Sequence, residues 1–200
     1  MIKPILFNTQ MVQAILEGRK TTTRRIAKGL KDATKETHGD FKWDYKQSWM
    51  NDLGLEIHAP YHIGDILYVR ETWLAHSRGL NTLAFKYKAD DAVNDMVSFT
   101  KERFNKFYKF ADQEKWQPSL FMPKEAARIF LKVKDVRVER LQDITEEGIR
   151  AEGITEEWPP HARDKFQELW DSTTKEYRWR LNPWVWVIEF EKIEKSEVEQ

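Results

Sequence analysis

Gly18-Arg19-Lys20-Thr21-Thr22-Thr23-Arg24-Arg25 is the stretch that says most about this chain. Four cationic side chains and three hydroxyls fall within eight consecutive residues. Groups of this kind are costly to bury without partners and well suited to contact a ligand. The stretch therefore predicts a ligand that carries phosphate, carboxylate or a polar base.

The residues around this stretch predict its local structure. Residues 5–7 read as a short strand, and Asn8 or Thr9 can cap a helix that ends at Gly18. Threonine favours extended backbone, so residues 19–25 are expected to form a strand or a bulged turn leading into one. In a regular strand Lys20 and Thr23 point to opposite faces, so they can converge only through a bulge or turn.

Length and composition limit the class of protein. Two hundred residues suit one domain, and the balance of 33 acidic and 33 basic side chains means that affinity for nucleic acid would have to come from local patches. The absence of cysteine excludes disulfides and zinc ribbons. No run approaches membrane-spanning length and no signal peptide is recognisable, so a cytoplasmic protein without a membrane partner is expected.

The rest of the chain mixes strands with short helices. Strands are expected at residues 63–73, 129–140 and 184–190, a helix capped by Thr145 ends near residue 153, and a second helix follows residue 158. Residues 28–60 show no sustained period and read as an irregular insertion. Without a βαβ rhythm or internal repeat, the pattern predicts an α+β fold around a small β-barrel.

Four blocks in this order resemble an ASCH domain of the PUA-like superfamily, in the enlarged form carried by phages and prophages. The blocks are residues 18–25, the Gly64-Asp65-Ile66-Leu67 strand start, residues 143–153, and the closing Trp186-Val187-Ile188-Glu189-Phe190 strand. The resemblance implies one PUA-like barrel over residues 1–200 with short flanking helices and two irregular insertions, at about 28–60 and 78–117. It also implies a nucleobase, nucleoside or RNA ligand.

The resemblance further implies an activity, because small ASCH proteins include acetylcytidine amidohydrolases. Their motif matches Lys20, Thr23 and Glu152, with Arg25 as a further match. Amide hydrolysis needs a nucleophile, a base and an acid for the leaving amine, and these roles would fall to Thr23, Lys20 and Glu152 respectively. Neighbouring cations, including Arg19, would lower the pKa of a lysine that acts as a base.

Further side chains are candidates for contacts with the substrate. We expect Arg19, Arg25, Arg70, Glu71 and Trp73 to bind it. Adjacent strand residues such as Arg70 and Glu71 point to opposite faces, so one of them would enter the cleft and need a partner. No metal and no other cofactor is expected, because His58 and His62 are separated by Pro60 and lack a third ligand nearby.

Other interpretations of the same residues remain open. The basic stretch can be a solvated strand whose arginines pair with surface carboxylates, and Glu152 before Gly153 can be an ordinary helix-end residue. The chain can be an RNA-binding module without chemistry. It can also be a metal-independent ribonuclease in which the same lysine, arginine and glutamate act on phosphate.

Overall fold

A computed structural model of the chain describes residues 1–28, 42–43, 49–50, 56–94, 96–111, 113, 115–155 and 159–198. The chain divides into two compact units. Unit 1 comprises Met1–Gly18, Ile66–Lys132 and Lys192–Gln200, and unit 2 comprises Arg19–Asp65 and Val133–Glu191. Each unit combines segments that are far apart in the sequence, and the expected single domain over residues 1–200 stays a prediction.

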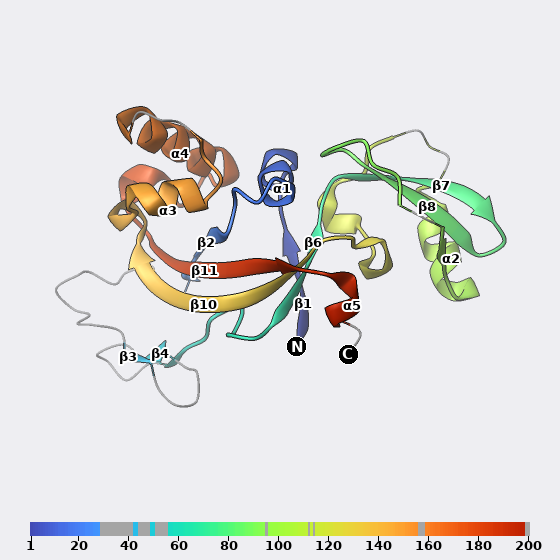
Figure 1. Cartoon of the computed structure of the whole chain (residues 1–200), viewed down its shortest axis with the longest axis horizontal. Helices are drawn as coiled ribbons and strands as arrows, with labels where there is room; N and C mark the ends of the chain where they lie inside the picture. Colours follow the sequence, from blue (N-terminus) through green and yellow to red (C-terminus); the bar gives the residue numbers. More distant parts are fainter. Residues whose placement is uncertain are drawn as a thin grey trace. The chain divides into compact units, whose positions relative to one another are not determined.

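The main sheet has five strands and is mixed (Figure 1). In order of hydrogen-bonded neighbours these are β1 (Ile2–Leu6), β6 (Ile66–Arg70), β10 (Phe130–Arg140), β11 (Trp184–Ile193) and β2 (Thr22–Ile26). β1 pairs with β6 in parallel, whereas β6 with β10 and β11 with β2 pair antiparallel. The expected α+β class is confirmed at this level.

The predicted closed barrel is not formed by the described strands. Closure requires the first and last strands of the sheet to pair. β1 and β2 lie at the two ends of the strand order, and no pairing joins them within the described residues. Pro4 in β1 fits this position, because a proline has no N–H to donate and is found on edge strands.

Local signals at the start of the chain act as predicted. Helix α1 spans Thr9–Leu16, and the Asn8 side chain caps it by accepting a hydrogen bond from the Met11 N–H at 2.9 Å. Gly18 follows the helix with a φ of +74°, a left-handed conformation that glycine adopts without strain. The chain then extends toward β2.

In unit 1 the described residues of the second expected insertion, 78–117, form regular elements and not only irregular structure. β7 (Trp73–Gly79), β8 (Thr82–Tyr87) and β9 (Val97–Ser98) form a three-stranded antiparallel sheet, and α2 spans Lys101–Tyr108. The strand expected over residues 63–73 is two strands, because β7 pairs with β8 after β6 has ended at Arg70.

The core of unit 1 explains why this segment is ordered. Trp73, Phe85, Phe99 and Phe107 belong to one buried cluster that takes residues from β7, β8 and α2. Large aromatic side chains contribute most to burial energetics. The aromatic residues of the second insertion therefore supply much of the core of this unit.

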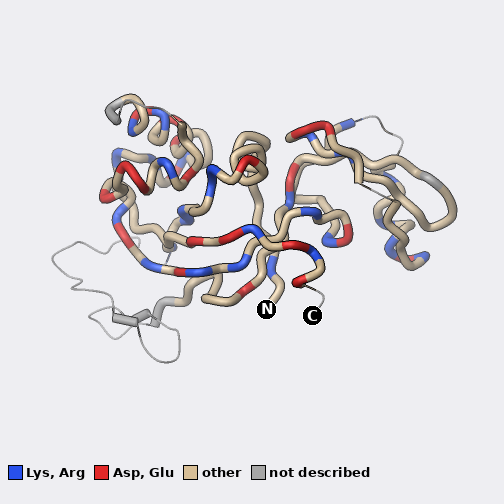
Figure 2. The backbone as a smooth tube through the Cα atoms, in the orientation of Figure 1, with Lys and Arg blue, Asp and Glu red and all other residues tan. Residues whose placement is uncertain are grey.

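In unit 2 two helices pack with the strands. α3 spans Glu146–Ala151 and α4 spans Pro159–Thr173, and they lie side by side in Figure 1. Their buried residues, including Phe166 and Trp170 of α4, pack with Val185 and Val187 of β11. Lys and Arg are interspersed with Asp and Glu along β10 and β11 (Figure 2).

The remaining elements are short. Single-turn 3₁₀ helices are η2 (Ser119–Phe121), η3 (Lys124–Ala126), η4 (Leu141–Asp143) and η5 (Trp179–Leu181), and α5 spans Lys195–Val198. β3 (Lys42–Trp43), β4 (Trp49–Met50) and β5 (Glu56–Ile57) form a second three-stranded sheet in the first expected insertion. Most of residues 28–60 lie outside the described part of the chain.

Within that described part, no helix combines the length and apolar character needed to cross a membrane.

The core of unit 1 gives a prediction about stability. Phe85 has no exposed surface, so Phe85→Ala should lower the free energy of unfolding by about 3–5 kcal/mol through lost burial and a residual cavity. Leu80→Ala is the control, because Leu80 is 90% exposed. Urea unfolding followed by tryptophan fluorescence measures both, and equal small losses would contradict the assignment of Phe85 to the core.

Candidate functional site

Lys20 and Glu152 meet in unit 2. The Lys20 Nζ donates hydrogen bonds to Glu152 Oε2 at 2.5 Å and to the Glu152 backbone carbonyl at 3.1 Å. The two residues are 132 positions apart in sequence, and they are only 2% and 5% exposed. A buried ion pair with this geometry is costly to dehydrate and depends on both partners being present.

Backbone contacts bring the two residues together. Lys20 and Glu152 form an isolated antiparallel β-bridge, and the Thr21 N–H donates to the Ala151 carbonyl at 2.8 Å. Glu152 is the C-cap residue of α3, and the Thr145 side chain caps the other end by accepting from the Gly148 N–H. The sequence signals for this short helix thus place a carboxylate beside the segment that enters β2.

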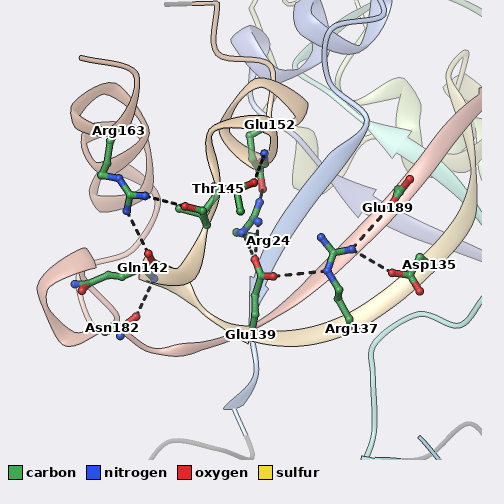
Figure 3. Close-up of polar contacts among 12 residues, drawn as sticks. Arg24, Asp135, Arg137, Glu139, Gln142, Thr145, Glu152, Arg163, Asn182 and Glu189 are labelled. Carbon is green, nitrogen blue, oxygen red and sulfur yellow. Dashed lines mark hydrogen bonds and ion pairs between the residues drawn. The ribbon is translucent and has the colours of Figure 1, made fainter. Parts of the chain in front are cut away.

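Arg24 is the second cation at Glu152. Its Nη1 donates to Glu152 Oε1 at 3.0 Å, and its Nη2 donates to Glu139 Oε1 at 2.6 Å (Figure 3). Arg137 continues the network, with its Nε 3.6 Å from Glu139 Oε2. Gly148 leaves room for this arrangement, because a Cβ there would lie 3.1 Å from Arg24 Nη2.

The surroundings of Lys20 lower the pKa of its side chain. Removal from water lowers the pKa of Lys20 from its ordinary value, and Arg25 and Arg24 add to this effect. The charge of Glu152 and its hydrogen bond act in the opposite direction. The net direction is downward, as a general base requires, and burial is the main cause rather than the neighbouring cations expected from the sequence.

Arg19 and Arg25 lie in the same unit. Arg19 Nη1 donates to the Gly153 carbonyl at 2.5 Å, which ties it to the end of α3. Burial lowers the pKa of Arg25, while the negative charge of Glu152 opposes this shift. Arg19 therefore contacts the residue that follows Glu152, and Arg25 interacts electrostatically with Glu152 itself.

Thr23 is buried, and its place in β2 is opposite Ile188 of β11. Side chains alternate along a strand, so Thr23 points away from the face that carries Thr22 and Arg24. The Thr22 hydroxyl is buried without a hydrogen-bond partner within the described residues. The Arg24 side chain contacts Glu152, and Thr22 lies on the same face of β2 as Arg24. The threonine hydroxyl on the Glu152 side of the strand is therefore that of Thr22.

The other predicted binding residues belong to unit 1. Glu71 is buried and receives two hydrogen bonds from Arg128, at 2.9 Å from Nε and 3.0 Å from Nη2. Arg128 also binds Asp90 through Nη1 at 2.8 Å and Nη2 at 2.9 Å. Glu71 is therefore the buried charge that needed a partner, and Arg128 supplies it.

Arg70 and Trp73 have different surroundings. The Arg70 guanidinium donates to the backbone carbonyls of Met122, at 3.0 Å, and of Leu120. Trp73 has 0% exposure and packs against Phe85 at 5.6 Å between ring centroids. We leave Trp73 out of the candidate site because its ring is part of the hydrophobic core.

Sequence reasoning did not select several residues of these clusters. Strand alternation places Arg24 on the same face as Lys20, but the family motif does not include Arg24. Nothing in the sequence indicates a role for Glu139 or Arg128, because the residues with which they pair are far away in the chain. Within the described residues no three His, Asp or Glu side chains gather in the way a metal ion requires.

Comparisons with known proteins give only distant similarities. No family model matches the chain, and no curated protein sequence matches it. A crystal structure of a protein from Enterococcus faecalis V583, described by the family model DUF984, is 10% identical with a TM-score of 0.42, covering 100% of this chain and 80% of that chain. An ASCH domain from Lactobacillus crispatus JV V101 is 10% identical with a TM-score of 0.37, covering 96% and 79%. Similarities at this level do not establish the family of the chain.

The buried ion pair gives a prediction for a double-mutant cycle. Lys20→Met leaves the buried Glu152 carboxylate with one cation fewer and should lower the free energy of unfolding by about 3–5 kcal/mol. The double variant Lys20→Met/Glu152→Gln should be less destabilised than the sum of the two single variants by about 1 kcal/mol or more. Urea unfolding of the four proteins measures the coupling, and additive effects would show that the two side chains do not interact.

Lys20 also predicts a pH dependence of stability. Its pKa in the folded chain is below the ordinary value of 10.5, so between these two pH values the unfolded chain holds a proton that the folded chain has released. The free energy of unfolding should therefore rise with pH in this window, and Lys20→Met should reduce the rise. Thermal unfolding across the alkaline range measures the slopes, and identical slopes would contradict the lowered pKa.

Proposed function

We propose that the chain binds a nucleobase or nucleoside in unit 2 and hydrolyses an acyl amide on its exocyclic amine, with acetylcytidine as the leading substrate. The observation that supports this most directly is the 2.5 Å contact between Lys20 Nζ and Glu152 Oε2 in a buried setting. Two residues selected by the sequence motif for opposite proton-transfer roles are thus in direct contact.

The proposed reaction uses three groups. A threonine hydroxyl attacks the acyl carbon and gives its proton to the neutral Lys20 amine. The carbon–nitrogen bond breaks, and the Glu152 carboxylic acid protonates the leaving exocyclic nitrogen. Water then hydrolyses the acyl-threonine ester and releases the carboxylic acid, which regenerates the hydroxyl.

The ion pair can supply both the base and the acid. Moving one proton from the Lys20 ammonium to the Glu152 carboxylate along their contact gives an amine and a carboxylic acid. Burial assists this transfer, because it disfavours the charged form of Lys20. Arg24 donates to Glu152 and Glu139, so its guanidinium is shared between the two carboxylates.

The nucleophile is proposed to be Thr23, on the basis of the motif. Thr22 is the alternative, because its buried hydroxyl has no hydrogen-bond partner among the described residues and lies on the strand face of Arg24. Valine at either position keeps the shape of the side chain and removes the hydroxyl. Comparing Thr23→Val with Thr22→Val therefore separates the two assignments.

A nucleoside-binding function without chemistry is the second candidate. Lys20, Arg24, Glu139 and Glu152 balance one another in charge and bond one another directly. Such a saturated cluster can hold β2 and α3 in place for binding without taking part in proton transfer. Turnover of the substrate distinguishes the two candidates.

The activity test uses the full chain and acetylcytidine, with release of cytidine followed by chromatography. Lys20→Arg should lower kcat about 100-fold or more, because arginine keeps the positive charge but cannot act as a base. Glu152→Gln should have a loss of similar size, since an amide cannot donate the proton.

Lys132→Ala is the matched control, because Lys132 is exposed on β10 and lies outside the cluster. Thermal unfolding of each variant identifies any loss that comes from misfolding. Unchanged turnover in a folded Lys20→Arg variant would remove the proposed mechanism, and binding without turnover in the unmodified protein would support the second candidate.

A further inference from the structure

Unit 1 contains a hollow of about 330 Å³ that the proposed hydrolase site does not use. It lies where α2, η2 and η3 come together. Among the described residues that line it, the charged ones are all basic: Arg70, Arg103, Lys106, Lys109 and Lys124. The chain as a whole has no net charge, so this concentration of cations is local.

The five cations differ in their partners. Arg103 is paired with Glu125 at 2.5 Å, and Arg70 is bonded to backbone carbonyls. Lys106, Lys109 and Lys124 have no carboxylate partner within the described residues. Three ammonium groups at one hollow without counter-charges repel one another, and an anionic ligand would relieve that repulsion.

Aromatic rings lie beside these ammonium groups. Phe121 of η2 is 49% exposed and stacks on Phe110 with 6.2 Å between ring centroids and 23° between ring planes. Lys109 Nζ lies 4.9 Å from the Phe110 centroid. An exposed ring next to unpaired cations is the combination with which proteins bind single strands, where phosphates take the charge and unpaired bases stack on the ring.

We propose that this hollow binds single-stranded nucleic acid, with Lys106, Lys109 and Lys124 contacting phosphates and Phe121 stacking on a base. The spacing of the lysines fits this role. Lys106 and Lys109 are three positions apart at the end of α2, so they lie on one side of the helix. Lys124 approaches from η3. The proposal does not depend on the hydrolase activity of unit 2.

Salt dependence tests the phosphate contacts. A labelled RNA of about 12 nucleotides should bind the full chain with an affinity that falls as salt increases, measured by fluorescence anisotropy. In the variant Lys106→Ala/Lys109→Ala/Lys124→Ala, the slope of log affinity against log salt should decrease by about 2, because each phosphate contact on a single strand contributes about 0.7.

The matched control removes the same charge elsewhere. Lys88→Ala/Lys175→Ala/Lys192→Ala changes three exposed lysines that do not line the hollow, and it should keep the slope of the unmodified protein. Equal losses in the two triple variants would overturn the proposal, because the affinity would then follow total charge and not this site.

A second variant tests the stacking contact. Phe121→Ala should weaken binding about fivefold or more, whereas Phe121→Trp should preserve it, since stacking on one ring contributes about 1 kcal/mol or more per base. A single-stranded DNA of the same sequence distinguishes recognition of phosphate and base from recognition of the ribose hydroxyl. Preference for a duplex, or binding to vesicles of anionic lipid that the RNA does not compete away, would contradict the proposal.

Discussion

The carboxylate of Glu152 is held between two cations, and the arrangement of unit 2 depends on this contact. Lys20 binds one carboxylate oxygen at 2.5 Å and Arg24 binds the other at 3.0 Å. Charges removed from water in this way are tolerated only with partners in good geometry. The end of α3 and the start of β2 are therefore fixed to each other by a contact that neither segment can replace locally.

The same contact links the protonation of Lys20 to the stability of the fold. Burial lowers the pKa of Lys20 and so favours the form that can accept a proton. Glu152 acts in the opposite direction, because its charge and its hydrogen bond favour the protonated form of Lys20. Groups with shifted pKa values and charged partners occur both in structural networks and in active sites. In this chain the cluster of Lys20, Arg24 and Glu152 has the charged partners and the shifted pKa that are found in both kinds of site. Turnover and folding therefore have to be measured on the same variants.

Unit 1 uses its charges differently. Arg128 joins Glu71 to Asp90 and lies 4.1 Å above the ring of Tyr87, so these charges are satisfied internally. In the part of the chain that the structure describes, Lys106, Lys109 and Lys124 of the hollow are not paired with carboxylates. The segment that resembled an irregular insertion supplies both the aromatic core of the unit and part of the hollow.

The sequence by itself determined the local elements. Asn8, Gly18 and Thr145 act on neighbouring backbone groups, so caps and turns could be placed from composition and spacing alone. The motif also selected Lys20 and Glu152. Tertiary structure alone decided that the described strands form an open sheet, that residues 78–117 build a core, and that Glu139 and Arg128 complete the charge clusters. These features depend on contacts between residues far apart in the chain, and local periodicity does not encode which distant partner a buried charge or an aromatic ring will meet.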